Sequence, residues 1–140
     1  MKNLPTLFFA TGAVFVLIGM MWGIQMSITE DHTLAPAHAH LNLIGFVVMS
    51  LYGTFYALSP TAGKSRLAAF HYGLATLAVI VMVPGIAMAI SGKSLILAKT
   101  GSILALLSMS LFLFMVLRHG IGRASQIERE NMTLQPHPAE

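Results

Sequence analysis

Long apolar stretches alternate with short polar links along most of the chain. The four stretches cover residues 4–26, 36–58, 67–90 and 95–117. Each has about the ~20 residues that a helix needs to cross the hydrocarbon core of a bilayer. Because lipid offers the backbone no hydrogen-bond partner, helices are the expected structure of such stretches. The pattern therefore predicts an all-α integral membrane protein with four transmembrane helices.

The links between these stretches are short, which limits how the helices can be arranged. Consecutive helices joined by short links become antiparallel neighbours, so we expect an up-down four-helix bundle. We assign residues 1–118 to this four-helix domain. Residues 119–140 are mostly polar and contain prolines near their end, and we expect them to form a flexible cytoplasmic tail.

The charged residues of the links predict the direction of the helices. Six basic residues fall on one side of the expected membrane: Lys2, Lys64, Arg66, Arg118, Arg123 and Arg129. Glu30, Asp31 and Lys93 fall on the other side. Cytoplasmic loops are enriched in Lys and Arg, so both termini are expected to be cytoplasmic. We expect a multi-pass protein of the bacterial inner (cytoplasmic) membrane, whose first stretch is an uncleaved span.

Composition agrees with a membrane protein and limits its chemistry. Hydrophobic residues make up 56% of the 140 residues and charged residues only 9%, whereas soluble domains have roughly 25% charged residues. The chain has no cysteine, so metal ligands are restricted to imidazole, carboxylate and thioether groups. The net charge of +3 is ordinary for a membrane protein with basic inner loops and does not indicate a nucleic-acid partner. We therefore expect the lipid bilayer to be the main partner of the chain.

The second stretch, PAHAHLNLIGFVVMSLYGTFY, has two histidines and an amide near its outer end. Successive helical residues are about 100° apart, so His38 and His40 should point to nearly opposite faces and cannot easily chelate one ion together. The His38 face continues through Asn42 and other small or polar residues, as expected of a face that packs against another helix or lines a cavity. The His40 face is apolar, and an imidazole there is unfavourable without a partner.

Two interpretations of these imidazoles remain open. In the first, both lie near enough to the membrane surface to be hydrated, with Pro36 at the first helical position. In the second, they ligate haem or a metal ion, because neutral imidazole is the commonest ligand of this kind and a porphyrin favours apolar surroundings.

The segment DHTLAPAHAHLNLIGFVVMSLYGTFYALSP resembles the tenth helix of subunit I of haem-copper oxidases, together with the acidic loop before it. The resemblance implies that His38 ligates a high-spin haem and that His40 ligates a low-spin haem. It also implies that Asp31 belongs to an outer polar cluster near the haem propionates. The expected cofactor is haem b, with copper as a further candidate at His38 and His40. The expected cofactor-binding residues are His38, His40, Asn42 and Asp31.

The chain departs from that family at the copper centre. No two of its histidines are adjacent, so the adjacent copper ligands of the oxidases are absent. Oxygen reduction by this chain alone is therefore not expected, and whether it is an enzyme stays open. His71 lies near the cytoplasmic start of the third stretch, roughly 20 Å from His40 at about 1.5 Å per residue. We therefore exclude it as a second haem ligand and expect it to lie on a packing face of small residues.

A second axial ligand is needed if the haem is six-coordinate. Candidates at the outer end are His32, Met26, Met88 and the second stretch of another copy of the chain, with Met20, Met21 and Trp22 slightly deeper. The oxidase subunit has twelve helices in three arcs of four, and this chain resembles one arc. A homo-oligomer, dimer or trimer, is therefore the expected assembly.

Three functions remain open. The first is a haem-binding membrane protein that acts in electron transfer, gas sensing or cofactor handling. The second is a non-catalytic small subunit or assembly factor of a respiratory membrane complex. The third, a small transporter, is disfavoured because no acidic or basic residue lies deep within a stretch, where ion relays usually have one.

Overall fold

The computed structural model describes residues 3–121, and this part of the chain is helical without any strand. Four helical spans are long and apolar enough to cross a membrane. The elements are α1 (Leu4–Thr29), α2 (Ala35–Asn42), η1 (Leu43–Val48), α3 (Met49–Leu58), α4 (Pro60–Gly63), α5 (Arg66–Ile90) and α6 (Ile96–His119). The second span consists of α2, η1 and α3 in one continuous helix. The prediction of an all-α, four-span membrane protein is confirmed, with every boundary within three residues of the expected one.

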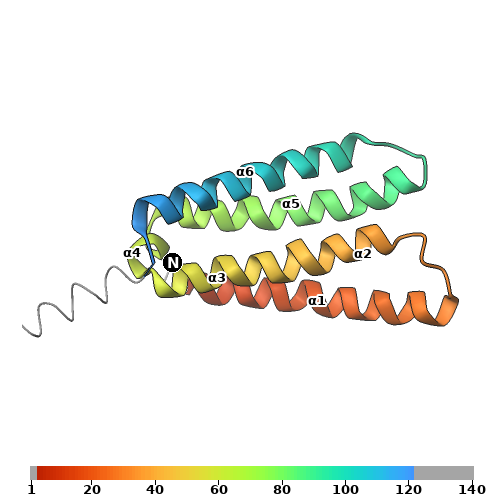
Figure 1. Cartoon of the computed structure of the whole chain (residues 1–140), viewed down its shortest axis with the longest axis horizontal. Coiled ribbons are helices and arrows are strands. Elements are labelled where there is room, and N and C mark those ends of the chain that lie inside the picture. Colours follow the sequence, from red (N-terminus) through yellow and green to blue (C-terminus); the bar gives the residue numbers. More distant parts are fainter. Residues whose placement is uncertain (1–2, 122–140) are drawn as a thin grey trace, which may run out of the picture.

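Consecutive spans run in opposite directions, so the beginning of α1 and the end of α6 lie at the same end of the bundle (Figure 1). Lys64, Arg66 and Arg118 lie at this end, which we call the basic end. Glu30 and Asp31 lie at the other end, which we call the acidic end. Most of the predicted tail, from residue 122 onward, lies outside the described residues.

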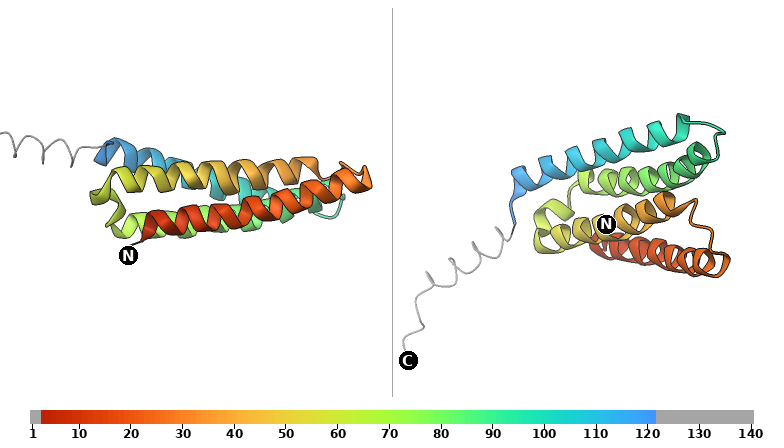
Figure 2. Two further views of the ribbon diagram at one scale, coloured as in Figure 1. Left: turned by 90° about the horizontal axis from the view of Figure 1, so that it is seen from below. Right: turned by 45° about the vertical axis from the view of Figure 1, so that its right-hand side comes forward.

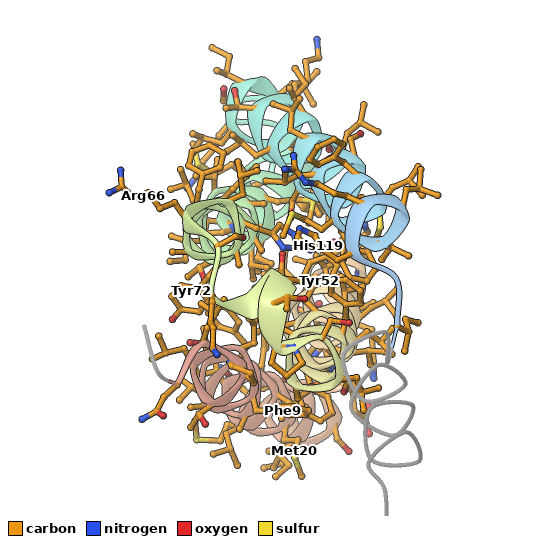
Figure 3. All side chains as sticks on the ribbon, turned by 90° about the vertical axis from the view of Figure 1, so that its left-hand side faces the viewer. Phe9, Met20, Tyr52, Arg66, Tyr72 and His119 are labelled. Atoms are coloured by element: carbon orange, nitrogen blue, oxygen red, sulfur yellow. The ribbon has the colours of Figure 1, made fainter. Side chains whose placement is uncertain are left out.

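The spans form two antiparallel pairs that pack against each other. α1 follows the second span along its length, and α6 follows α5 (Figure 2). The pairs meet where α2 contacts α5 and where α1 contacts α5, whereas α6 makes few contacts with the second span. Seen along the bundle, the four spans surround a space that side chains such as Tyr52 enter (Figure 3).

Glycines allow α5 and α6 to approach closely. A Cβ atom at Gly101 would overlap the backbone of Met82, and one at Gly85 would overlap the backbone of Ala98. Small residues are typical of membrane helix interfaces because packing, rather than the hydrophobic effect, holds such helices together in lipid.

The second span contains six residues, Leu43–Val48, whose backbone is π-helical. A π-helical turn is wider than an α-helical turn, so the spacing of the inward positions changes locally. Ala37, Leu41, Gly45 and Met49 are all buried at intervals of four residues. The wide turn keeps these residues on one face, whereas uniform α-helical spacing would turn Met49 by about 120° from Ala37. We expected the packing face at His38 and Asn42 and did not predict this turn.

Candidate functional site

His38 forms a hydrogen-bonded pair with Asn42 one turn along the second span. The Asn42 Nδ2–H group donates to His38 Nε2, with 3.0 Å between the nitrogen atoms. Both side chains are half-buried and face α1. The prediction that the His38 face packs against another helix is therefore confirmed.

The surface of α1 that receives this pair contains Gly19 and Gly23. A Cβ atom at Gly23 would lie 3.1 Å from Cε1 of His38, and one at Gly19 would overlap the amide of Asn42. The ring of Trp22 meets the ring of His38 edge to face, with 6.1 Å between their centroids. Residues 19–23 form a G-x-x-x-G sequence, which is typical of close membrane-helix packing. This G-x-x-x-G pattern is the one sequence signal from which the contact between α1 and the second span could have been predicted.

Two polar atoms of the pair, His38 Nδ1 and Asn42 Oδ1, are buried without a hydrogen-bond partner. A buried polar atom without a partner costs about 1–3 kcal/mol. The His38–Asn42 pair therefore lies at the contact between α1 and the second span with two of its polar atoms unsatisfied, which lowers its contribution to stability.

His40 has a different environment from His38. Its Nδ1–H group donates to the carbonyl oxygen of Pro36, with 2.7 Å between the nitrogen and oxygen atoms. This bond places the proton on Nδ1 and leaves the Nε2 lone pair available. Leu43, Val47 and Leu51, which continue the His40 face, are 43–58% exposed. His38 and His40 therefore point to different surroundings, as the sequence predicts.

Asp31 lies in the exposed loop between α1 and α2. Its Oδ1 accepts a hydrogen bond from the backbone amide of Thr33 at 2.9 Å. Hydrogen bonds from the Thr33 hydroxyl and amide lower the pKa of Asp31. None of the hydrogen bonds within residues 3–121 joins Asp31 to His38 or His40. Asp31 and Trp22 both line one surface hollow of about 120 Å³, and the Trp22 ring also meets the His38 ring.

A second polar cluster lies toward the basic end, where His71 on α5 is completely buried. The Tyr56 hydroxyl lies 2.9 Å from His71 Nδ1, and the Ser108 hydroxyl lies 3.1 Å from His71 Nε2. The ring of Tyr52 lies 4.4 Å from the ring of His71, centroid to centroid. This cluster joins the second span, α5 and α6. We expected His71 on a packing face, which is confirmed, but its hydroxyl partners were not predicted.

The protonation of this cluster follows from hydrogen-bond satisfaction. Tyr56 is 1% exposed, and residues 3–121 offer its proton no other acceptor, so its O–H group donates to His71 Nδ1. The proton of neutral His71 is then on Nε2 and is donated to Ser108 Oγ. Ser108 accepts this bond, and its own hydroxyl is paired with that of Tyr52, which donates to the sulfur of Met109 at 3.8 Å.

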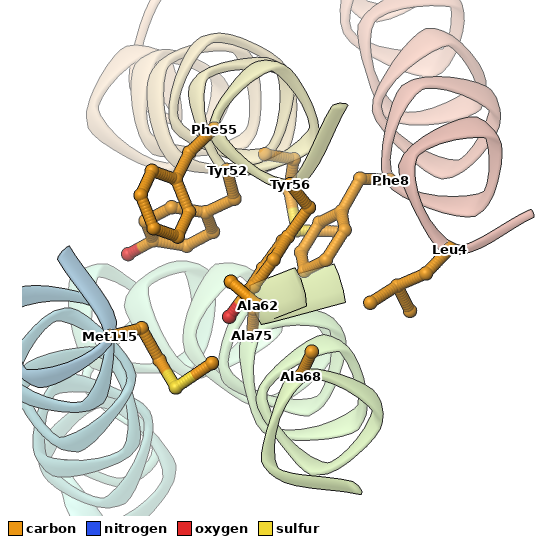
Figure 4. Packing of buried hydrophobic residues seen from close by; sticks show 10 residues of the cluster. Leu4, Phe8, Tyr52, Phe55, Tyr56, Ala62, Ala68, Ala75 and Met115 are labelled. Carbon is orange, nitrogen blue, oxygen red and sulfur yellow. The ribbon is translucent and has the colours of Figure 1, made fainter. Parts of the chain in front are cut away.

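Phe8 of α1 completes the aromatic surround of this cluster. Its ring stacks on that of Tyr56, with 5.5 Å between centroids and 21° between planes (Figure 4). Phe8 is also fully buried, and the ring of Tyr72 meets it edge to face at 5.2 Å. The cluster therefore joins all four spans at the basic end.

These features define a polytopic α-helical membrane protein. Its described residues contain a half-buried His38–Asn42 pair toward the acidic end and a buried polar cluster around His71 toward the basic end. Among residues 3–121, no group of three or more His, Cys, Asp or Glu side chains is arranged to hold a metal ion. No protein-family model, curated protein or solved structure matches the chain.

Proposed function

We propose that the chain is a haem-binding membrane protein of the haem-copper oxidase subunit I type, with His40 as an axial ligand of haem b. The hydrogen bond from His40 Nδ1 to Pro36 carries this proposal, because it leaves Nε2 as the ligating atom. A hydrogen bond from the other ring nitrogen orients a ligating histidine and raises its basicity. The neighbouring exposed leucine and valine side chains suit the apolar face of a porphyrin.

The surroundings of His38 fit ligation less well. Its Nε2 atom is bonded to Asn42, and its ring packs between Gly23 and Trp22. We propose that His38 and Asn42 act through helix packing, by holding α2 on α1 and so fixing where His40 points. Asp31, on the exposed loop, would lie near the propionates only if the haem extends toward the acidic end.

One chain offers one suitable ligand for this haem, so a six-coordinate iron needs another. The second ligand is proposed to be His40 of another copy in a homo-oligomer. Haem held in this way would supply one-electron transfer, or gas binding if one axial position is open. Copper held by His40 side chains of two copies is the corresponding metal-ion alternative.

The membrane orientation belongs to the same proposal. Lys64, Arg66 and Arg118 would place the basic end in the cytoplasm, in the inner membrane of a bacterium. His40 would then lie toward the outer side. Cysteine introduced at the exposed Thr33 should react with a membrane-impermeant maleimide in intact spheroplasts, whereas cysteine at the exposed Lys64 should not react.

An absorption spectrum tests the haem. Detergent-purified protein from haem-supplemented cells should show a Soret band that shifts on reduction with dithionite. His40→Ala should lose this band, while His119→Ala, a histidine change at the opposite end of the bundle, should retain it. Colourless wild-type protein, or a band that is unchanged in His40→Ala, would refute the proposal.

A non-catalytic small subunit or assembly factor of a respiratory membrane complex is the second candidate. It is supported by α1 and α6, each of which packs on few neighbours and presents many exposed apolar side chains. This function predicts colourless protein that co-purifies with a larger complex. Protein that is purified in mild detergent without any other protein chain, and that carries haem, would exclude this second function.

A further inference from the structure

The surface hollow that Asp31 and Trp22 line has a volume of about 120 Å³ and lies where α1 ends and the loop to α2 begins. Its wall combines apolar and polar side chains, and Asp31 is the only charged residue among them. The lining residues are Trp22, Gln25, Met26, Thr29, Asp31 and Leu34. A ligand that suits this wall therefore has both an apolar part and a group that a carboxylate attracts.

The hollow lies at the level of the lipid headgroups. α1 has 26 residues and is about 39 Å long at about 1.5 Å per residue, whereas the hydrocarbon core is about 30 Å thick. Trp22 lies seven residues before the end of α1, or about 10 Å along the helix. Tryptophan side chains are enriched at this depth, where membrane and water meet. A ligand can therefore reach the hollow from water or from the headgroup layer.

The fixed charges at the wall of the hollow are negative. Hydrogen bonds from Thr33 lower the pKa of Asp31 and so favour its charged form, and His32 contributes least to this shift. The last turn of α1 contains no basic residue that would offset the negative end of the helix dipole. Lys93 and Lys99 lie between α5 and α6 and on α6, and neither lines the hollow. The described wall thus has a negative charge without a cationic side chain.

Trp22 supplies the aromatic part of the wall. Its half-buried ring meets the ring of His38 and packs against the cluster that contains Ala37 and Leu41, so its position is set by contacts inside the bundle. An aromatic ring attracts a cation that lies over its face, and indole does so most strongly. The hollow therefore brings together a carboxylate and an indole, the two side-chain groups that favour an organic cation.

We propose that this hollow binds a small organic ammonium group, either from an ethanolamine or choline lipid headgroup or from a free amine. The ammonium charge pairs with Asp31 and contacts the ring of Trp22, while its carbon atoms contact Met26 and Leu34. A cavity of about 150 Å³ holds benzene, so an open hollow of about 120 Å³ admits a group with fewer atoms. Binding here does not depend on the proposed haem, because His40 does not line the hollow.

Other occupants suit the wall less well. A divalent metal ion prefers several oxygen ligands, whereas the wall has one carboxylate, and residues 3–121 contain no group of three or more potential His, Cys, Asp or Glu ligands. An anion is repelled by Asp31. A neutral molecule of the same shape gains nothing from the carboxylate or from the charge distribution of the ring.

Trp22 is the only tryptophan of the chain, so its fluorescence reports directly on the hollow. The full chain in dodecyl maltoside, an uncharged detergent without an amine, is titrated with tetramethylammonium chloride. The controls are tert-butanol, a neutral molecule of similar shape, and sodium chloride. We expect a saturable change with tetramethylammonium alone. A change that does not saturate, or that either control reproduces, would overturn the proposal.

Two acidic residues provide a matched pair of variants. Asp31→Asn should weaken tetramethylammonium binding about threefold, because an exposed charge pair contributes modestly. Glu30→Gln removes the same charge one residue away from the hollow and should leave the affinity nearly unchanged. Circular dichroism checks that both variants keep their helices. Equal affinities of wild type and Asp31→Asn, or equal losses in the two variants, would contradict the site.

The aromatic contact is tested by Trp22→Leu, which removes the ring and keeps an apolar side chain. Binding to this variant is followed by the carbon-13 signal of the Asp31 carboxyl group, which is also measured in the wild type. Tetramethylammonium should bind about threefold more weakly to the variant because the attraction of the indole is lost. An unchanged affinity would exclude the contact with Trp22.

Two bilayers distinguish the sources of the ammonium group. In nanodiscs of digalactosyl diacylglycerol, whose headgroup is uncharged and has no amine, tetramethylammonium should titrate Trp22 as it does in detergent. In phosphatidylcholine nanodiscs it should cause little change if a lipid headgroup already occupies the hollow. Full titration in both bilayers would assign the hollow to free amines. A lack of titration in the galactolipid would overturn the proposal.

Discussion

Tyr56 on α3 donates a hydrogen bond to His71 on α5, with 2.9 Å between the hydroxyl oxygen and Nδ1. Both side chains are fully buried, and the bond links two spans that are joined by the loop at the basic end. It also fixes which nitrogen of His71 carries the proton that Ser108 accepts.

Tyr56→Phe should lower the free energy of unfolding by about 1–2 kcal/mol, because it leaves the His71 Nδ1 lone pair without a donor. Ser110→Ala is the control, since that hydroxyl is exposed and bonds only to its own helix. Unfolding in mixed detergent and dodecyl sulfate micelles, followed by circular dichroism, measures both. Equal stabilities of the two variants would contradict the assigned role of the Tyr56 hydroxyl.

Gly101→Ala should separate α5 from α6. The new methyl group would overlap the backbone of Met82, and overpacking of this kind costs about 1–3 kcal/mol. Gly73→Ala is a matched control on α5, because a Cβ atom there meets nothing within 4 Å. That control should be neutral or slightly stabilising, since alanine favours helix more than glycine does. A comparable loss of stability in both variants would show that the overlap with the Met82 backbone is not the cause of the destabilisation.

The contact between Asn42 and Gly19 can be tested by a double-mutant cycle. Gly19→Ala alone should destabilise the chain by about 1–3 kcal/mol, because its Cβ atom takes the place of the Asn42 amide. In an Asn42→Ala background most of that loss should disappear, so the two changes should not be additive. Unfolding measurements on the four proteins give the coupling energy. Additive effects would mean that the two residues do not compete for the same space.

Asp31 should titrate below its usual pKa of 3.8, because the Thr33 hydroxyl and amide stabilise its charged form. A depressed pKa contributes stability that is present above pH 3.8 and is lost as the pH falls through the folded-state value. Carbon-13 NMR of the carboxyl group measures the pKa directly. Thr33→Val should raise the pKa toward 3.8, whereas Thr54→Val, on the exposed face of α3, should not change it. An unchanged pKa in Thr33→Val would rule out the proposed cause.

The four spans follow from the sequence because the thickness of a bilayer sets a length that apolar stretches must meet. The opposite directions of His38 and His40 follow from helical geometry alone. Local rules are therefore sufficient for the fold class and for the different directions of these two histidines. Ligation of haem by His40 stays a prediction, because it concerns a group outside the chain.

The remaining features depend on contacts between distant residues. His71 meets Tyr56 and Ser108, which are 15 and 37 residues away in the sequence, so no local pattern indicates that they are partners. The π-helical turn falls in LIGFVV, which has the composition of any apolar helix. Gly45 of this segment packs closely on α1, where a Cβ atom at Gly45 would lie 3.1 Å from Cβ of Phe15, and no local pattern shows this contact.

The wide turn at Leu43–Val48 holds about one residue more than an α-helical segment of the same rise. Removing one residue from it would give regular α-helix and leave His38 and His40 on their present faces. Removing one residue from α3, where the helix is regular, would instead rotate everything before it by about 100° relative to the end of the span. The wide turn is thus the part of the second span where the gene can lose one codon while both histidines keep their directions.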